Sequence, residues 1–201
     1  PKIKSGMTAA LKQLETLVAT VIEAGKFPFE LGGEHSVTPA AIRPFARKYK
    51  DLVVLQFDAH ADLRDGYQGE HYSHASAMRR VLDHENVTLV QVGIRGLSQE
   101  EADFYAANRR RIQMHLGIDQ ARWDIETIVA PLKGRPVFIT FDIDALDSAV
   151  MPATGTTVPG GLSYLTALSI LRRASEAGNI VGADLVEFAP IKGFHAYDYM
   201  A

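Results

Sequence analysis

The stretch Leu52-Val53-Val54-Leu55-Gln56-Phe57-Asp58-Ala59-His60-Ala61-Asp62 joins a predicted strand to three potential metal ligands. Its first six residues are almost all apolar, which is typical of a strand buried on both faces of a parallel sheet. Asp58, His60 and Asp62 follow at alternate positions, where the strand would open into a loop. Ligands of α/β sheets bind at the carboxyl ends of the strands. The stretch therefore predicts an α/β fold with a polar site at this strand end.

A second apolar run, Pro136-Val137-Phe138-Ile139-Thr140-Phe141, ends in the same way, in Asp142-Ile143-Asp144. His35 adds an imidazole after Gly32-Gly33-Glu34, just beyond a shorter predicted strand. A single Asp-x-His-x-Asp sequence could be a solvated turn, but acidic motifs at two strand ends favour a metal site. Carboxylates and imidazoles without thiols suit hard to borderline divalent ions, and the excess of carboxylates favours Mn²⁺ over Zn²⁺. The set suits two cations, although one ion could be satisfied with fewer ligands.

The chemistry of such a site follows from the charges. Several carboxylates in one pocket repel and raise one another's pKa unless cations neutralise them. Two metal ions roughly 3.5–4 Å apart can share one water and lower its pKa towards neutrality, which generates hydroxide at pH 7. Hydrolysis is therefore the predicted reaction class. A phosphoesterase or deacetylase is less favoured, because no phosphate-clamping basic residues and no separate acid–base pair are evident beside these ligands.

Helical and extended patterns alternate along the whole chain. Strands are predicted over residues 27–31, 52–57, 87–93, 112–115, 136–141 and 180–187. Helices are predicted over residues 7–24, 38–48, 73–83, 99–108, 119–132 and 163–177. Thr38 and Ser163 are expected to cap their helices, and Pro44 is expected to kink or restart the helix that contains it. Six strands separated by helices predict a three-layer α/β/α domain with a mainly parallel sheet, spanning residues 1–201 as one unit.

The composition excludes several classes of protein. The net charge is −3, so no basic field favours nucleic acid or an anionic membrane as a partner. There are no cysteines, which excludes disulfides and zinc–thiolate sites. The longest apolar stretches are too short to span a bilayer, and no signal-peptide pattern is present at the N-terminus. A cytoplasmic globular protein is the expectation.

Four motifs together resemble the ureohydrolase family, which includes arginases, agmatinases and formiminoglutamases. They are Gly32-Gly33-Glu34-His35-Ser36, Phe57-Asp58-Ala59-His60-Ala61-Asp62, Phe141-Asp142-Ile143-Asp144-Ala145-Leu146-Asp147 and Thr157-Val158-Pro159-Gly160-Gly161-Leu162-Ser163. The resemblance implies a binuclear Mn²⁺ centre, in which a metal-bridging hydroxide attacks the carbon of a guanidino group. It also implies an eight-stranded sheet, of which six strands are expected here, and assembly into homo-oligomers, namely trimers or hexamers.

The family's metal ligands can be carried over position by position. His35 is expected to bind one Mn²⁺ and His60 the other, while Asp58 and Asp142 bridge both ions. Asp62 is expected to bind the first ion and to accept a hydrogen bond from the bridging hydroxide. Asp144 is then expected to complete the coordination of the second ion.

Two further residues acquire roles from the same resemblance. His74, in Tyr72-Ser73-His74-Ala75, resembles the family's proton-shuttle histidine, with His71 as the competing candidate. Glu187 resembles the glutamate that grips the guanidinium of the substrate. An acid at the end of an apolar strand needs a cation or donors, since an unpaired buried charge is expensive. A structural pair of Glu187 with Arg or Lys is the alternative. The predicted catalytic residues are thus His74, Asp62 and Glu187, and the predicted substrate contacts are His74 and Glu187.

The choice of substrate depends on departures from the arginase pattern. Arg64 stands where arginases usually carry Asn, and Gly96-Leu97-Ser98 replaces their acidic residues. These departures favour agmatine, hydrolysed to putrescine and urea for polyamine biosynthesis, over a substrate with an α-amino acid head. Arg64 could instead meet a carboxylate, unless Asp65 or Glu70 neutralises it. Guanidinobutyrase, arginase, formiminoglutamase and a catalytically impaired homologue therefore stay open.

The resemblance also raises an expectation about the ends of the chain. Family members carry two further strands before the first motif and a helix after the last. This chain opens inside a predicted helix and stops at Tyr199-Met200-Ala201, so it is expected to be truncated at both ends. The strand over residues 27–31 would then lie at the edge of the sheet.

Overall fold

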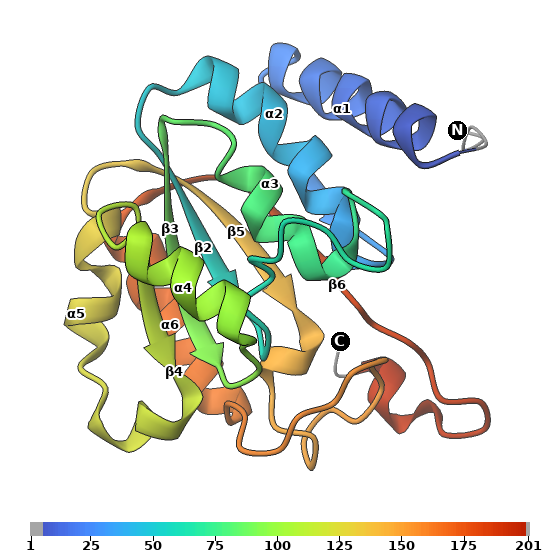
Figure 1. Ribbon diagram of the computed structural model, residues 1–201, viewed down its shortest axis with the longest axis vertical. Helices are drawn as coiled ribbons and strands as arrows, with labels where there is room; N and C mark the ends of the chain where they lie inside the picture. Colours follow the sequence, from blue (N-terminus) through green and yellow to red (C-terminus); the bar gives the residue numbers. More distant parts are fainter. Residues whose placement is uncertain (1–5, 200–201) are drawn as a thin grey trace.

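A computed structural model of the protein describes residues 6–199, and at its centre is a six-stranded sheet (Figure 1). The strands are β1 (Phe29–Leu31), β2 (Leu52–Phe57), β3 (Val87–Ile94), β4 (Ile112–Leu116), β5 (Pro136–Asp142) and β6 (Asn179–Val186). Their order across the sheet is β1-β6-β5-β2-β3-β4, and every neighbouring pair is parallel. All six predicted strands are confirmed, and the sheet is parallel throughout rather than mainly parallel.

Helices cover both faces of the sheet, which confirms the three-layer α/β/α prediction. They are α1 (Met7–Glu23), α2 (Thr38–Lys48), α3 (Ala77–Val81), α4 (Gln99–Ala107), α5 (Ile125–Val129) and α6 (Tyr164–Ala177). One apolar cluster joins α2 and α3 to the sheet, with α1 and α4 packed against it. A second cluster joins α5 and α6 to the opposite face. None of the helices in residues 6–199 is long and apolar enough to cross a membrane.

The structure corrects one local prediction about helices and refines two others. Thr38 does not cap α2 but lies in its first turn, where its hydroxyl donates to Asp184 instead. Pro44 lies inside α2, which continues past it to Lys48, so the helix does not restart there. Residues 119–132 are mainly helical as predicted, but they form short 3-10 turns on either side of α5, which Asp124 starts by accepting a hydrogen bond from the backbone of Glu126. Ser163 caps α6 as predicted.

The strand β1 is short and lies at the edge of the sheet. It pairs with β6 on one side, and no strand of residues 6–199 pairs with its other side. Phe29 is 59% exposed and Leu31 is 76% exposed. The expectation that the chain opens within a helix concerns residues 1–5, which lie outside the described residues. The first described helix begins at Met7.

A row of polar side chains crosses the sheet near the carboxyl ends of the strands. Its members occupy paired positions on five successive strands: Glu30 on β1, Asp184 on β6, Thr140 on β5, Gln56 on β2 and Gln91 on β3. Alternate residues of a strand point to the same face, so this row lies directly beneath the residues two positions later. Asp58 and Asp142 are two of these, and the polar row is therefore the floor of the predicted metal site.

Candidate metal centre

The carboxyl end of β2 holds Asp58 in a fixed orientation. Asp58 is fully buried, and both of its carboxylate oxygens accept hydrogen bonds. Oδ1 accepts from the backbone N–H of His60 at 2.6 Å, and Oδ2 accepts from Nε2 of Gln56 at 2.7 Å. Gln56 is itself held by Gln91, whose Nε2 donates to its Oε1 at 2.6 Å. Two members of the polar row thus place the first predicted bridging residue.

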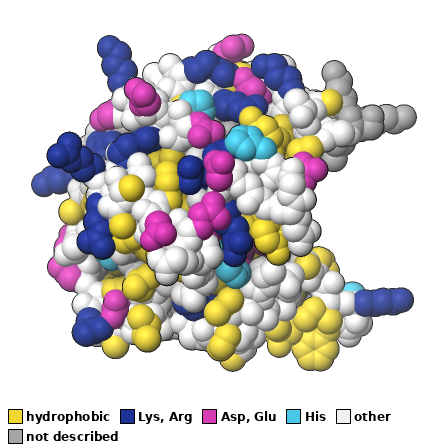
Figure 2. Space-filling model, viewed as in Figure 1, with side chains coloured by type: hydrophobic (Ala, Val, Ile, Leu, Met, Phe, Trp, Pro, Cys, Tyr) yellow, Lys and Arg dark blue, Asp and Glu magenta, His cyan; other side chains and the backbone are white. Residues whose placement is uncertain are grey.

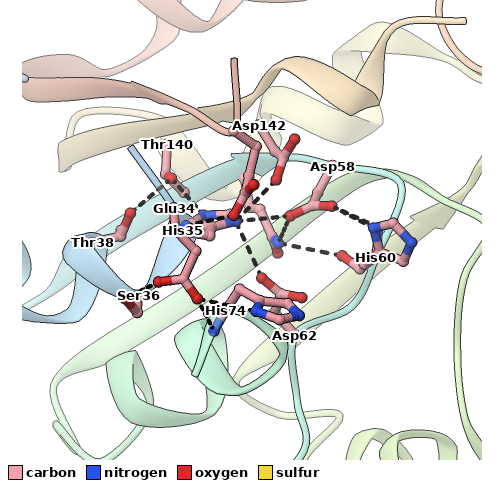
Figure 3. Close-up of polar contacts among 12 residues, drawn as sticks. Glu34, His35, Ser36, Thr38, Asp58, His60, Asp62, His74, Thr140 and Asp142 are labelled. Carbon is pink, nitrogen blue, oxygen red and sulfur yellow. Dashed lines mark hydrogen bonds and ion pairs between the residues drawn. The ribbon is translucent and has the colours of Figure 1, made fainter. Parts of the chain in front are cut away.

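Three carboxylates converge on one nitrogen of His35 (Figure 3). Nδ1 of His35 lies 3.2 Å from Asp58 Oδ2, 3.1 Å from Asp62 Oδ2 and 3.3 Å from Asp142 Oδ2. We refer to these four residues as the inner group. His35 is 1% exposed, and its Nδ1 has no hydrogen-bond partner among the described residues. A buried nitrogen that faces three carboxylate oxygens in this way fits a divalent cation between them.

A second set of ligands lies nearer the surface and shares Asp58 with the first. Nδ1 of His60 lies 3.0 Å from Asp144 Oδ2 and 3.6 Å from Asp58 Oδ1. We refer to Asp58, His60 and Asp144 as the outer group. In each of two trios, His35 with Asp58 and Asp62, and Asp58 with His60 and Asp144, the ligand atoms lie within 4.8 Å of one another. Asp58 thus belongs to both sets of potential ligands, and its role as a bridging ligand stays a prediction.

The loop that follows β5 connects the two groups. Asp142 contributes Oδ2 to the inner group, and its Oδ1 accepts a hydrogen bond from the backbone N–H of Asp144 at 2.9 Å. Asp144 in turn accepts from the backbone N–H of Ala59 at 2.9 Å, which ties this loop to the end of β2. The contacts place Asp142 beside His35 only, so its role as a second bridge stays a prediction.

The charges of the site are unbalanced in the absence of cations. Burial and the charge of Asp58 raise the pKa of Asp62 to about 7. Burial also raises the pKa of Asp142 well above its usual range, again with a contribution from Asp58. Contacts with Asp144 and Asp58 raise the pKa of His60 to about 11. Such shifts are expected where carboxylates crowd together, and divalent cations held among them would relieve the repulsion.

Two of the predicted catalytic residues adopt a strained backbone conformation. Asp62 has φ 54° and Glu187 has φ 63°, which lie in the left-handed region that non-glycine residues rarely occupy. Each is held there by its neighbours: the carbonyl of Asp62 accepts from the backbone N–H of Arg79 at 2.9 Å, and the backbone N–H of Glu187 donates to Gly33 at 2.7 Å. Strain of this kind concentrates at functional sites.

Glu187 is attached to the inner group through the backbone. Its Oε1 accepts a hydrogen bond from the backbone N–H of His35 at 2.7 Å. Burial raises the pKa of Glu187, although the hydrogen bond from His35 opposes the shift. No Arg or Lys among the described residues forms an ion pair with it, which disfavours the alternative of a structural salt bridge.

His74 lies at the pocket, whereas His71 points elsewhere. The backbone N–H and ring Nδ1 of His74 lie 2.9 and 3.0 Å from Oε1 of Glu34 (Figure 3). His71 is exposed, contacts the guanidinium of Arg80 and does not line the pocket. The geometry therefore favours His74 over His71 for proton transfer. Ser36 also donates to Glu34, so Glu34 connects His74 to the loop that carries His35.

The two groups open into a pocket of about 390 Å³. The pocket is lined by Glu34, His35, His60, Asp62, Arg64, Tyr67, His74, Ala75, Gly96, Leu97, Ser98, Glu101, Asp142, Thr156 and Glu187. Figure 2 shows acidic and histidine side chains close together near the middle of one face of the molecule. Arg64 lies over the ring of Tyr67 and 3.9 Å from Glu101. Asp65, considered as its partner, pairs with Arg79 and Arg80 instead.

Several residues that hold the site in place are not predicted from the sequence. Gln56 and Thr140 were detectable in principle, as polar residues inside apolar strands. Glu34 lies within a quoted motif, but nothing in the sequence pairs it with His74. Arg95 donates to the backbone carbonyls of Asp144 at 2.6 Å and Val158 at 2.8 Å, and so anchors the loop after β5.

The chain matches the arginase family over residues 2–197. It is 40% identical to an agmatinase of Bacillus anthracis over 186 residues, which are 90% of this chain and 62% of that protein. It is 38% identical to an N(1)-aminopropylagmatine ureohydrolase of Thermus thermophilus over 177 residues, or 87% of this chain and 59% of that protein. The crystal structure of the agmatine ureohydrolase of Thermoplasma volcanium has a TM-score of 0.84 at 32% identity, and the match covers 98% of this chain and 66% of that chain. The chain thus spans less than two thirds of the length of these two curated relatives.

Proposed function

Because the chain belongs to the arginase family, we propose that it forms the metal-binding core of a binuclear manganese hydrolase of guanidino compounds. Agmatine, hydrolysed to putrescine and urea, is the proposed substrate. The observation that carries the proposal is the position of Asp58, whose two carboxylate oxygens face the inner and outer groups separately. A homo-oligomeric state and a cytoplasmic location stay predictions of the family resemblance.

The inner group would hold one cation and the outer group the other. His35, Asp62 and Asp142 would bind the first ion, His60 and Asp144 the second, and Asp58 both. The donor set of imidazoles and carboxylates without thiols fits Mn²⁺. Two such ions, when bound, lower the pKa of a shared water so that it can act as a nucleophile at neutral pH.

Glu187 would bind the guanidinium of the substrate. Its Oε1 is occupied by the backbone N–H of His35, so Oε2 is left to accept from the ligand. An ion pair with hydrogen bonds between guanidinium and carboxylate is stronger than a neutral hydrogen bond and fixes the orientation of the planar group. Since Glu187 is anchored on the backbone of a predicted metal ligand, substrate and metal centre are held in one frame.

His74 would deliver a proton to the departing amine. It lines the pocket with Glu187 and Asp62, and Glu34 holds its ring through Nδ1. With Nδ1 bound to a carboxylate, Nε2 is the nitrogen left to exchange a proton with the substrate. Glu34 therefore orients the proposed proton shuttle.

Two features of the pocket favour agmatine. The segment Gly96-Leu97-Ser98 lines the pocket and brings no charged side chain of its own. Arg64 is shared between Glu101 and the ring of Tyr67, which reduces its availability to a carboxylate. The names of the Bacillus and Thermus relatives support the same class of substrate. Arg64 nevertheless lines the pocket, so 4-guanidinobutyrate is the second candidate.

Metal analysis followed by urea release tests the proposal. Protein loaded with Mn²⁺ and then dialysed should retain two ions per chain, and it should release urea from agmatine faster than from 4-guanidinobutyrate or arginine. Protein loaded with Zn²⁺ serves as the comparison for the choice of metal. Retention of fewer than two ions would reject the binuclear centre. Urea release mainly from 4-guanidinobutyrate would reject agmatine and assign Arg64 to substrate binding.

A further inference from the structure

A chain of buried polar groups runs from His35 back into the sheet. Nε2 of His35 lies 3.0 Å from the hydroxyl of Thr140, and this hydroxyl lies 3.4 Å from that of Thr38. The hydroxyl of Thr38 donates to Asp184 Oδ2 at 2.8 Å (Figure 3 shows the first three groups). All four residues are buried, with exposures of 0–1%. Water therefore does not compete for these hydrogen bonds.

With Asp184 ionised, the chain has one direction. A carboxylate accepts hydrogen bonds, and each hydroxyl has a single proton to donate. Thr38 donates its proton to Asp184, so it can only accept from Thr140. Thr140 then has no proton left for His35 and must accept one from Nε2. The acceptor at the far end thus requires a hydrogen on Nε2 of His35.

We infer that Thr140, Thr38 and Asp184 are positioning residues that keep a proton on Nε2 of His35 and so present the Nδ1 lone pair to the inner group. Nδ1 is the nitrogen that faces Asp58, Asp62 and Asp142. A histidine binds a metal ion through a nitrogen without a hydrogen, and a hydrogen bond from the other nitrogen fixes the tautomer and the ring orientation.

Two members of the polar row therefore act on two different ligands. Gln56 orients Asp58 through its carboxylate, and Thr140 orients His35 through its ring. Asp184 acts on His35 from a distance, since two hydroxyl groups separate them. The inference rests on the proposed metal function, but the direction of the chain can be measured without activity.

The direction is tested by NMR of histidine labelled with ¹⁵N, both metal-free and loaded with diamagnetic Zn²⁺. Wild-type protein should show a slowly exchanging Nε2–H signal from His35. Thr140→Val should lose this protection, and Thr140→Ser should restore it. Thr38→Val should also weaken the signal although Thr38 does not touch His35, because Thr140 is then free to turn its own proton towards Nε2. An unchanged Nε2–H signal in both Val variants would overturn the inference.

Metal affinity gives the second readout. Titration with Mn²⁺ should show a loss of roughly 10–100-fold in affinity at one of the two sites in Thr140→Val, and near-normal affinity in Thr140→Ser. Thr88→Val is the matched control, because Thr88 lies on β3 and its hydroxyl accepts only from the distant Arg135. It should bind both ions normally.

The outcomes separate the inference from the proposed function. If wild-type protein binds no Mn²⁺, the proposed function fails, and the Nε2–H signal still decides the direction of the chain. If wild-type protein binds two ions and Thr140→Val binds them equally well, the function stands and the inference fails. If Thr140→Ser is as weak as Thr140→Val, side-chain volume rather than the hydroxyl is responsible, and the inference fails as well.

Discussion

The inner and outer groups use the same ligand chemistry but are supported in different ways. His35 is 1% exposed, and its second ring nitrogen is tied to Thr140. The side chain of His60 is 32% exposed, and its ring packs against Gly96, where an added Cβ would lie 2.6 Å from Cδ2. The inner histidine is thus held by hydrogen bonds inside the fold, and the outer histidine by close contact with a backbone that lacks a side chain.

The two residues proposed to handle substrate are both attached to the segment that carries His35. Glu187 accepts a hydrogen bond from the backbone N–H of His35. The ring of His74 contacts Glu34, which directly precedes His35 in the sequence. One short segment therefore carries a predicted metal ligand and contacts both the proposed guanidinium-binding acid and the proposed proton shuttle. The inner group is thus connected to more of the proposed site than the outer group, so we expect changes in the outer group to have less effect on the rest of the site.

The largest effect is expected where the two groups meet. Asp58→Asn replaces one of two charged oxygens that face His35 and His60, so both ions should be lost and urea release should become undetectable. Asp144→Asn changes the outer group alone and should retain the inner ion. Elemental analysis after dialysis measures both. Two full equivalents of Mn²⁺ in Asp58→Asn would show that Asp58 does not bridge.

The next largest effect concerns the proton shuttle. His74→Asn should reduce kcat by roughly 10²–10⁴-fold, because general acid catalysis is lost. Binding of metal should be unchanged, since no contact joins His74 to the inner or outer group. His71→Asn is the matched control and should retain normal kcat, as His71 lies outside the pocket. The reverse result would assign the shuttle to His71.

A smaller effect should separate the outer group from the inner one. Gly96→Ala places a methyl group against the ring of His60, which must shift because the opposing atoms are at 2.6 Å. The affinity of one ion should fall by about tenfold, in the lower part of the range for changes around metal ligands. The Nε2–H signal of His35 should stay the same. Simultaneous loss of that signal would mean that the two groups are not supported independently.

The sequence predicts the elements and the ligands because both depend on local order. An apolar run followed by acids gives a strand with ligands at its end, as for Asp58 and Asp142. The polar row could not be predicted, because it depends on register between strands that are distant in sequence. Glu30 and Asp184 are paired across β1 and β6, and nothing local to either residue indicates this. For the same reason the sequence predicts Thr38 as a helix cap, whereas its hydroxyl donates to Asp184.

The polar row also lowers the stability of the fold at Glu30 on β1, the end of the row that contacts no predicted metal ligand. The carboxylate oxygens of Glu30 are buried and have no hydrogen-bond partner among the described residues. Burial, with a contribution from Asp184, raises the pKa of Glu30 to about 8 from the usual 4.5. At Thr140 and Gln56 the same row is satisfied by His35 and Asp58. Ionisation of Glu30 should therefore destabilise the fold, whereas Thr140 and Gln56 have hydrogen-bond partners.

The smallest effect follows from this difference and leaves the site untouched. Between pH 4.5 and about 8 the unfolded chain loses the proton of Glu30 while the folded protein retains it, so stability falls as pH rises. Glu30→Gln cannot ionise and should remove this part of the fall, making the variant more stable than wild type by about 1–2 kcal/mol at pH 9 and similar at pH 4. Urea unfolding of metal-free protein at both pH values measures the difference, with Glu23→Gln, on the exposed end of α1, as the control. Equal stability of Glu30→Gln and wild type at both pH values would show that Glu30 finds a partner at the edge of the sheet.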